Sequence, residues 1–195
     1  GDVLRDVIRS RTVPVTRLSV IFRQAHTSLI VTNAHRINQG KTLLFPKDAN
    51  DFFLFQIEHL ANLDGWIVDI VQNRMPFRFN LRPLQAQVLS PMYRGPAGVE
   101  NLNIRLQAAL NPPDRGKTER SIGRNLFRVG DKIMQTRNNY EKDVFNGDIG
   151  RLTDINADDA TLSAMFDKSG ERKVTYTWEE AEDLVHAFAI SVHKS

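Results

Sequence analysis

The sequence predicts an α/β protein in which a mostly parallel, helix-covered sheet is interrupted by a small β-barrel. Three observations lead to this fold class. Strand-like and helix-like segments alternate through residues 1–110, which is typical of parallel sheets. After Pro112-Pro113, short strands follow one another with no long helix between them, as in small barrels. A last apolar strand, expected at residues 186–192, then returns to the first sheet.

In the first segment, helices are predicted where apolar residues recur at helical spacing. The second of them begins at Thr27 or Ser28 as N-cap and ends at Gly40. The expected helices cover residues 3–8, 28–39, 60–71 and 99–110. The expected strands cover residues 15–20, 52–57 and 87–90. Loops are expected at residues 41–51 and 74–84, and a turn at 94–98.

In the second segment, pairs of turn-forming residues separate the strands, as they do in hairpins. Strands are expected at residues 132–136, 149–155, 161–166 and 173–178. The resulting domain division is residues 1–118 for the first part of the α/β domain, 119–185 for the inserted barrel, and 186–195 for the returning strand.

Composition sets limits on the function. The hydrophobic content of 41% and charged content of 25% are ordinary for a globular protein. No apolar run approaches the roughly 18 residues of a membrane span, so we expect no membrane partner. The sequence has no cysteine, which suits the reducing cytoplasm, the location we expect.

The net charge is only +3, but its distribution is uneven. Residues 103–137 carry eight Lys/Arg against three Asp/Glu, whereas residues 155–186 carry three against eight. A basic segment of this kind suits a phosphate backbone as partner. On charge alone, a solvated surface is the commoner explanation.

A nucleotide-binding phosphate loop, Gly-x-x-x-x-Gly-Lys-[Ser/Thr], does not occur in the sequence. The nearest run, residues 115–118, has Asn111 where the first glycine belongs and two prolines inside the loop. We therefore expect no phosphate loop of this chain's own, and no ATP hydrolysis by this chain alone.

Seven short runs carry a resemblance to a known family. They are IFRQA at 21–25, NAHRIN at 33–38, LSPMYRGPAGVENLN at 89–103, FRVGDK at 127–132, RNNY at 137–140, FNGDIG at 145–150 and SVHKS at 191–195. In this order they resemble the C-terminal part of RecD-like DNA helicases of superfamily 1, the family of the exodeoxyribonuclease V alpha subunit. The similarity covers essentially the whole chain.

The resemblance implies a second RecA-like domain interrupted by an SH3-like barrel, and ATP-driven 5′-to-3′ movement along single-stranded DNA. The nucleotide-binding half and the final arginine motif of the family are absent from the sequence, and the motif at Ser195 is incomplete. We therefore expect part of an enzyme whose full length uses ATP and Mg²⁺. Its expected partners are single-stranded DNA and the missing N-terminal RecA-like domain of the same chain, with nuclease subunits as a further candidate. The metal ligands would lie in the missing half.

Arg23 is the expected catalytic residue. It follows an apolar strand, which places it at the edge where α/β sheets keep their ligands. By resemblance to motif IV, Arg23 senses the γ-phosphate, Phe22 stacks on adenine, and Gln24 belongs to the same cofactor site. The alternatives are a surface salt bridge for Arg23 and core packing for Phe22.

Ser191, His193 and Ser195 are expected to contact DNA. Alternate strand residues point to one face, so together they can present donors to phosphates and sugars, and by resemblance they begin motif V. A structural histidine is the commoner alternative for His193 alone. We expect no metal site, because the five histidines lack ligand spacing.

Asn138, Asn139 and Tyr140 are expected to contact DNA from a loop between barrel strands. An aromatic ring in an amide-rich basic loop suits base stacking, whereas a simple turn is the alternative.

Arg94 is also expected to contact DNA. It precedes a helix whose N-terminus suits an anion, or it merely orients its loop. Arg36 contacts DNA or satisfies the carbonyls at the end of its helix.

Two other functions remain open at this point. The first is a non-catalytic SH3-like module that binds nucleic acid. The second is a subunit that docks onto a nuclease, with the acidic residues 179–183 as the docking surface, although a solvated helix explains that stretch more simply.

Overall fold

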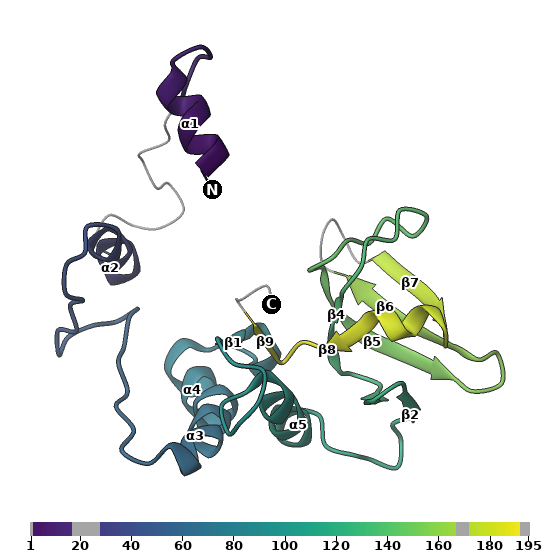
Figure 1. Cartoon of the computed structure of the whole chain (residues 1–195). Coiled ribbons are helices and arrows are strands. Elements are labelled where there is room, and N and C mark those ends of the chain that lie inside the picture. Colours follow the sequence, from purple (N-terminus) through teal and green to yellow (C-terminus); the bar gives the residue numbers. More distant parts are fainter. Residues whose placement is uncertain (1, 17–27, 167–171, 192–195) are drawn as a thin grey trace. The chain divides into compact units, whose positions relative to one another are not determined.

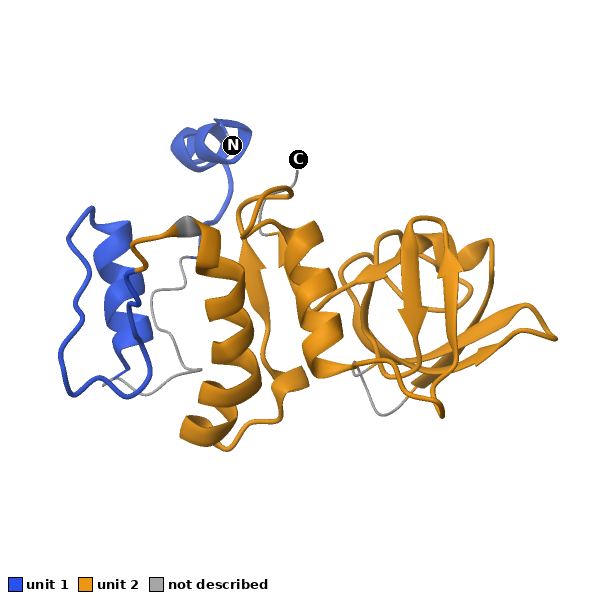
Figure 2. Ribbon diagram, turned by 90° about the horizontal axis from the view of Figure 1, so that it is seen from below, with its two compact units in different colours: residues 1–56 blue, residues 57–195 orange. Residues whose placement is uncertain are grey.

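The computed structural model describes residues 2–16, 28–166 and 172–191. The chain divides into two compact units, residues 1–56 and 57–195, coloured blue and orange in Figure 2. Each unit is described by itself.

The first unit contains the helices α1 (Asp2–Ser10) and α2 (Leu29–Asn38), and both confirm the sequence-based prediction. In α2 the side chain of Asn33 is buried, and its amide exchanges two hydrogen bonds with the backbone of Leu44, at 2.8 and 2.9 Å. Ser28 occupies the N-cap position, but its hydroxyl donates to Asp51 (2.6 Å). These contacts fasten the loop at 41–51 along the helix.

The strand predicted at residues 52–57 is wrong, because this segment is irregular in the structure. Its aromatic and β-branched residues favour a pleated surface only when a neighbouring strand pairs with them. Among the described residues they join no sheet, and Phe52 stacks on Phe45 instead (ring centroids 5.6 Å apart). The strand predicted at residues 15–20 falls mostly outside the described residues.

The second unit opens with a helix that continues beyond its predicted end. It runs through η1 (Leu60–Asn62), α3 (Leu63–Asp69), the π-helical turn η2 (Ile70–Arg74) and α4 (Met75–Phe79). The loop predicted from residue 74 is therefore wrong in its first part. Proline normally clashes with the carbonyl of the preceding turn. Here the π-helical turn η2 immediately precedes α4, in which Pro76 is the second residue, so the break in the regular α-helical hydrogen bonds coincides with the proline that lacks an N–H.

A pair of parallel strands lies against these helices. β1 (Val88–Ser90), which follows the short helix η3 (Pro83–Gln85), pairs with β9 (Ala189–Ser191) in register from Val88–Ala189 to Ser90–Ser191. α5 (Val99–Leu110) packs on them through Leu102 and Leu106, both fully buried, and begins and ends as predicted. No helix within the described residues is long and apolar enough to cross a membrane.

Asn103 on α5 ties the helix to the returning strand. Its side-chain amide donates to the Ala189 carbonyl and accepts from the Ala189 N–H, both at 2.9 Å. The two hydrogen bonds from the Asn103 amide thus take the place of those that a further strand would make with Ala189 at the edge of the β1–β9 sheet. Because Asn103 is 8% exposed, leaving these groups unpaired would cost free energy.

The second unit also contains a five-stranded antiparallel sheet, in the order β7-β6-β5-β4-β8 (Figure 1). Its strands are β4 (Lys132–Gln135), β5 (Ile149–Asn156), β6 (Thr161–Phe166), β7 (Arg172–Thr177) and β8 (Leu184–His186). The first four confirm the predicted strands. Their buried side chains Ile133, Leu152, Leu162, Tyr176 and Leu184 form one core together with Phe127, which precedes the sheet in sequence.

Two features of this sheet region were not predicted. β2 (Glu119–Ile122) and β3 (Asn125–Arg128) form a hairpin, which the polar, mostly exposed residues of β2 do not signal. The single strand predicted at residues 186–192 is split: β8 ends at His186 and belongs to the antiparallel sheet, whereas β9 joins β1. Two residues, Ala187 and Phe188, carry the chain from one sheet to the other.

Candidate nucleic-acid interface

The loop between β4 and β5 holds three of the predicted DNA-binding residues on a well-fixed backbone. Asn139 and Val144 exchange both backbone hydrogen bonds, at 2.7 and 3.0 Å, which closes the loop into a small hairpin. The Asn138 side chain accepts from the Asn146 N–H (2.9 Å), and the Asn139 side chain accepts from the Lys142 N–H (3.0 Å). The side-chain oxygens of Asn138 and Asn139 therefore stabilise the loop itself, which agrees with the alternative that these residues form a turn.

Tyr140 is the side chain that this loop exposes. The residue is 76% exposed, and its ring meets Phe145 edge to face, with centroids 5.8 Å apart. The Asn138 amide lies 3.3 Å from its hydroxyl. Tyr140 is therefore not part of the core. A fixed and exposed aromatic ring offers a face on which a base can stack.

The basic residues near Tyr140 are less available than the sequence suggested. Lys142 pairs with Glu180 (2.8 Å) and also donates to the Thr175 carbonyl (2.8 Å). Partial burial favours the protonated form of Glu180, but the hydrogen bonds from Lys142 and from the Thr177 backbone together hold the pKa of Glu180 below its usual value. Arg137 is 79% exposed and lies 3.4 Å from Asp183. The loop thus offers an exposed ring and one exposed cation, Arg137, which is paired with Asp183.

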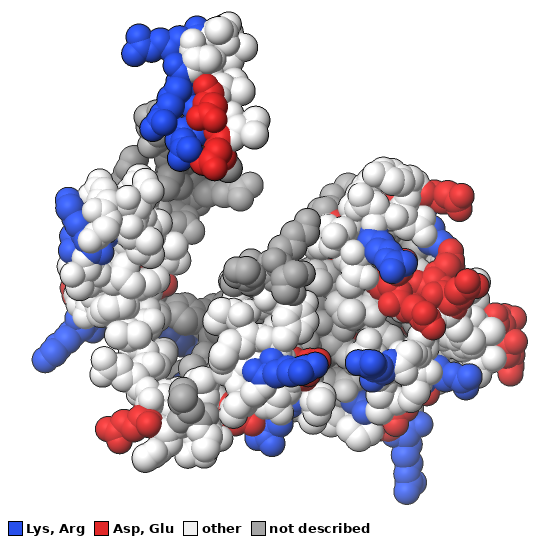
Figure 3. All heavy atoms as spheres, in the orientation of Figure 1, with Lys and Arg blue, Asp and Glu red and all other residues white. Residues whose placement is uncertain are grey.

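The acidic stretch at 179–183 is not a simple solvated helix. It forms the short 3-10 helix η4 (Glu180–Asp183), in which Ala181 is fully buried and Glu180 is tied to Lys142. Acidic side chains gather on the sheet surface seen in Figure 3, over the region of η4. A phosphate backbone would be repelled there.

The second predicted contact lies at the carboxyl ends of β1 and β9. Because these strands are parallel, Ser191 and the turn after Ser90 emerge at the same edge of the sheet. Parallel α/β sheets place their ligands at this edge. The structure thereby brings together Ser191 and the turn that carries Arg94, which are far apart in the sequence. Arg94 is exposed.

The predicted anion site at the start of α5 is not supported. The N–H of Val99 donates to the Met92 carbonyl (2.9 Å), and the N–H of Glu100 donates to the Tyr93 carbonyl (3.1 Å). These donors would have to be free to hold an anion. Arg94 can therefore act only through its own guanidinium group.

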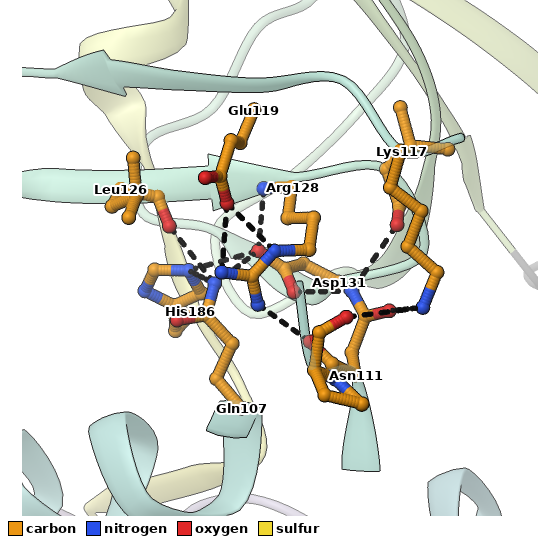
Figure 4. Close-up of polar contacts among 10 residues, drawn as sticks. Gln107, Asn111, Lys117, Glu119, Leu126, Arg128, Asp131 and His186 are labelled. Carbon is orange, nitrogen blue, oxygen red and sulfur yellow. Dashed lines mark hydrogen bonds and ion pairs between the residues drawn. The ribbon is translucent and has the colours of Figure 1, made fainter. Parts of the chain in front are cut away.

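A buried polar cluster joins α5 to the antiparallel sheet (Figure 4). The Asp131 carboxylate is fully buried and accepts from Gln107 (2.6 Å), from Asn111 (2.7 Å) and from the Arg128 N–H (2.8 Å). His186 Nε2 lies 3.2 Å from the same carboxylate. A buried charge without partners is costly, so these donors must stay in place together.

Arg128 completes this junction. It is 5% exposed, pairs with Glu119 (2.7 Å), and donates to the Asn111 carbonyl at the end of α5 (2.5 Å). Lys132 on β4 also donates to the carbonyls of Leu84 and Ala86, just before β1. The antiparallel sheet is thus fastened to α5 and to the β1 segment by directional bonds. In the sequence, the run at 127–132 carried only part of the family resemblance, and its partners on α5 and β8 could not be inferred from it.

The remaining site predictions fall elsewhere. Arg36 is exposed on α2, and its Nε donates to the Thr42 carbonyl (2.6 Å). The side chain thus binds the loop that follows its helix. Five predicted residues lie outside the described residues, and these are Phe22, Arg23, Gln24, His193 and Ser195. No group of three or more potential metal ligands is found among the described residues.

Comparisons with known proteins were made for the whole chain. Residues 102–166 match the model of the ATP-dependent RecD-like DNA helicase SH3 domain. The ATP-dependent RecD2 DNA helicase of Deinococcus radiodurans is 31% identical over 187 residues, which is 95% of this chain and 24% of that protein. Both matches are to RecD-like DNA helicases. The chain spans about a quarter of the length of this RecD-like relative.

Solved helicase structures are similar at a lower level. A structure concerned with DNA unwinding at forked double-stranded DNA by two coordinating Pif1 helicases is 17% identical, with a TM-score of 0.47, and covers 90% of this chain and 39% of that chain. Unliganded Pif1 from Bacteroides sp. is 14% identical, with a TM-score of 0.35, and covers 73% of this chain and 42% of that chain.

Proposed function

We propose that this chain is part of the motor of an ATP-dependent DNA helicase that moves 5′-to-3′ along single-stranded DNA. In this proposal residues 1–118 and 186–195 belong to the second RecA-like domain, and residues 119–185 are its inserted SH3-like domain. The alignment with the RecD2 helicase over 95% of the chain carries the proposal, because it includes both the helical part and the antiparallel sheet. The activity itself is proposed for a longer protein that contains this chain.

ATP and Mg²⁺ are assigned to the interface with the first RecA-like domain of that longer protein. Phosphoryl transfer mainly requires positive charge near the γ-phosphate oxygens, and an arginine from a neighbouring domain can supply it. Arg23 has this role in the proposal, with Phe22 and Gln24 beside the nucleotide. The role of this chain in ATP hydrolysis is thus to sense the γ-phosphate.

Single-stranded DNA is assigned to two elements of the second unit. The first is the β4–β5 loop, where Tyr140 stacks on a base. The second is the edge of the β1–β9 sheet, where Ser191, His193 and Ser195 contact phosphates and sugars and Arg94 pairs with a phosphate. The fixed backbone of the loop and the parallel pairing of β1 with β9 support this assignment.

The test of this proposal is the affinity of the chain for a labelled oligothymidine, measured by fluorescence anisotropy. Tyr140→Ala should weaken binding by about 1–3 kcal/mol, the usual value of one stacked base. Tyr140→Phe should bind almost as the wild type does, because stacking uses the ring face. The loss should persist at high salt, since it does not come from counterion release.

Leu126→Ala is a matched control, because Leu126 is an apolar residue of the same sheet region and is 43% exposed. Thermal melts should be unchanged for both alanine variants. If the wild-type chain does not bind the oligothymidine at low salt, or if Tyr140→Ala binds normally, the proposed DNA path is wrong.

The second candidate function is a non-catalytic module that binds nucleic acid. The match of the SH3 domain model to residues 102–166 favours it, because that domain alone is recognised there. The two functions differ in the longer protein. A motor hydrolyses ATP faster when single-stranded DNA is added, whereas a binding module shows no such stimulation.

A further inference from the structure

Hydrogen bonds from both β1 and α5 hold the turn between these two elements. The buried Ser90 hydroxyl donates to the Ala97 carbonyl (2.6 Å), and the Met92 N–H lies 3.2 Å from the same hydroxyl. The carbonyls of Met92 and Tyr93 accept from the first N–H groups of α5. The position of this turn is therefore determined by both the strand and the helix.

Gly98 shows how closely the turn is packed. A Cβ atom at this position would lie 2.5–2.6 Å from the backbone of Tyr93 and Arg94. Such distances are far below a normal contact, so the backbone of residues 93–94 packs against Gly98 and leaves no room for a side chain at that position.

Tyr93 is the aromatic residue presented by this turn. It is 53% exposed, and no described residue makes a hydrogen bond or ring contact with its side chain. A single exposed aromatic residue on a surface needs no explanation. Tyr93 differs because it precedes Arg94 in the turn that follows β1. The last residue of β1, Ser90, pairs with Ser191 at the end of β9, and this is the edge at which parallel α/β sheets place their ligands.

We propose that Tyr93 is a second stacking residue for single-stranded DNA, separate from Tyr140, with Arg94 pairing with a phosphate next to the stacked base. A ring on a fixed backbone loses little conformational entropy on binding, which makes it an effective partner. Stacking on a ring beside a cation also suits any base, because every base has a π-face. This inference rests on the proposed function and extends it to a second element.

The test uses the full chain and two oligomers of equal length, an oligothymidine and an abasic sugar-phosphate strand. Tyr93→Ala should weaken oligothymidine binding by about 5- to 150-fold, the range that corresponds to one stacked base. Its affinity for the abasic strand should equal that of the wild type. Tyr93→Phe should retain binding to oligothymidine.

Ile104→Ala is the matched control, since Ile104 is a 68% exposed apolar residue on α5 with no proposed role. It should bind both strands normally. In a double-mutant cycle, Tyr93→Ala and Tyr140→Ala should be additive, because the two rings stack on different bases.

The outcomes separate this inference from the proposed function. If Tyr140→Ala weakens binding but Tyr93→Ala does not, with both variants folded, the inference is wrong and the proposed function stands. If Tyr93→Ala weakens binding equally to both strands, the residue does not stack on a base, and the inference is also wrong. If the wild-type chain binds neither strand, both fail.

Discussion

At the scale of single residues, the tyrosines of this chain serve different purposes. The ring of Tyr140 is exposed on a fixed loop, whereas Tyr176 is fully buried in the antiparallel sheet and donates its hydroxyl to Gln135 (3.1 Å). Burial raises the pKa of the Tyr176 hydroxyl far above its usual value, and the nearby carboxylates of Glu180 and Asp148 raise it further. The folded protein therefore contains Tyr176 in its neutral, protonated form.

This raised pKa predicts a loss of stability in alkaline solution. In the unfolded chain Tyr176 ionises near pH 10, whereas in the folded protein it stays protonated, so the stabilisation is complete below about pH 10 and falls as pH rises further. Tyr176→Phe should show a smaller alkaline loss of unfolding free energy in urea titrations. Near pH 7 it should be less stable by about 1 kcal/mol, because Gln135 loses its donor.

The controls are Tyr93→Phe and Tyr140→Phe, whose side chains are exposed. They should lose stability with pH as the wild type does. An unchanged alkaline loss in Tyr176→Phe would assign that loss to other groups.

Arg23 is the residue on which the proposed motor function depends. In the longer protein, Arg23→Ala should reduce kcat for ATP hydrolysis by about 10²-fold or more and leave DNA binding nearly intact, because the charge acts on the transition state. Arg23→Lys should restore little activity, since lysine lacks the planar guanidinium group. Steady-state ATPase assays and DNA titrations measure the two effects, and wild-type turnover in Arg23→Ala would remove it from the mechanism.

At the scale of elements, the close contact of β5 and β6 depends on a glycine. A Cβ atom on Gly150 would lie 2.6 Å from the Met165 carbonyl and 2.8 Å from the Phe166 ring. The two strands are paired across this position, Gly150 facing Phe166. The sheet cannot accept a side chain here without moving the strand or the ring.

Gly150→Ala should therefore lower the unfolding free energy by about 1–3 kcal/mol, the usual range for overpacking a core. Gly65→Ala is the matched comparison, because a Cβ on Gly65 meets no atom within 4 Å and Gly65 lies inside the helix α3. It should be neutral or stabilising, since alanine favours the helix by about 0.5–1 kcal/mol. Equal melting temperatures for the two variants would contradict this account of the sheet.

At the scale of the whole molecule, the proposed activity requires parts that this sequence does not contain. No phosphate loop occurs in it, so nothing of that type gathers the β- and γ-phosphates and Mg²⁺. We predict that the purified chain does not hydrolyse ATP, with or without single-stranded DNA, although it binds the DNA. Phosphate release measured with and without oligothymidine tests this prediction. Strong DNA-stimulated turnover by the chain alone would overturn the proposal that ATP hydrolysis requires the first RecA-like domain of a longer protein.

The sequence by itself determined the elements whose signals are local. The helix at Val99–Leu110 and the strands β4, β5, β6 and β7 follow from apolar spacing and from turn residues such as Asn146-Gly147, which act within a few positions of the chain. The exposed place of Tyr140 agrees with its position in a turn-rich loop. These features need little information about distant parts of the chain.

Only the tertiary structure decided the features that depend on partners far away in sequence. The split between β8 and β9, the pairing of Ala189 with Asn103, and the burial of Asp131 among donors from α5, β3 and β8 all join residues that no local pattern links. For the same reason residues 52–57 do not form the predicted strand, because a strand exists only where a neighbour completes its hydrogen bonds. Local propensity sets what a segment favours, and burial and pairing decide whether that preference is realised.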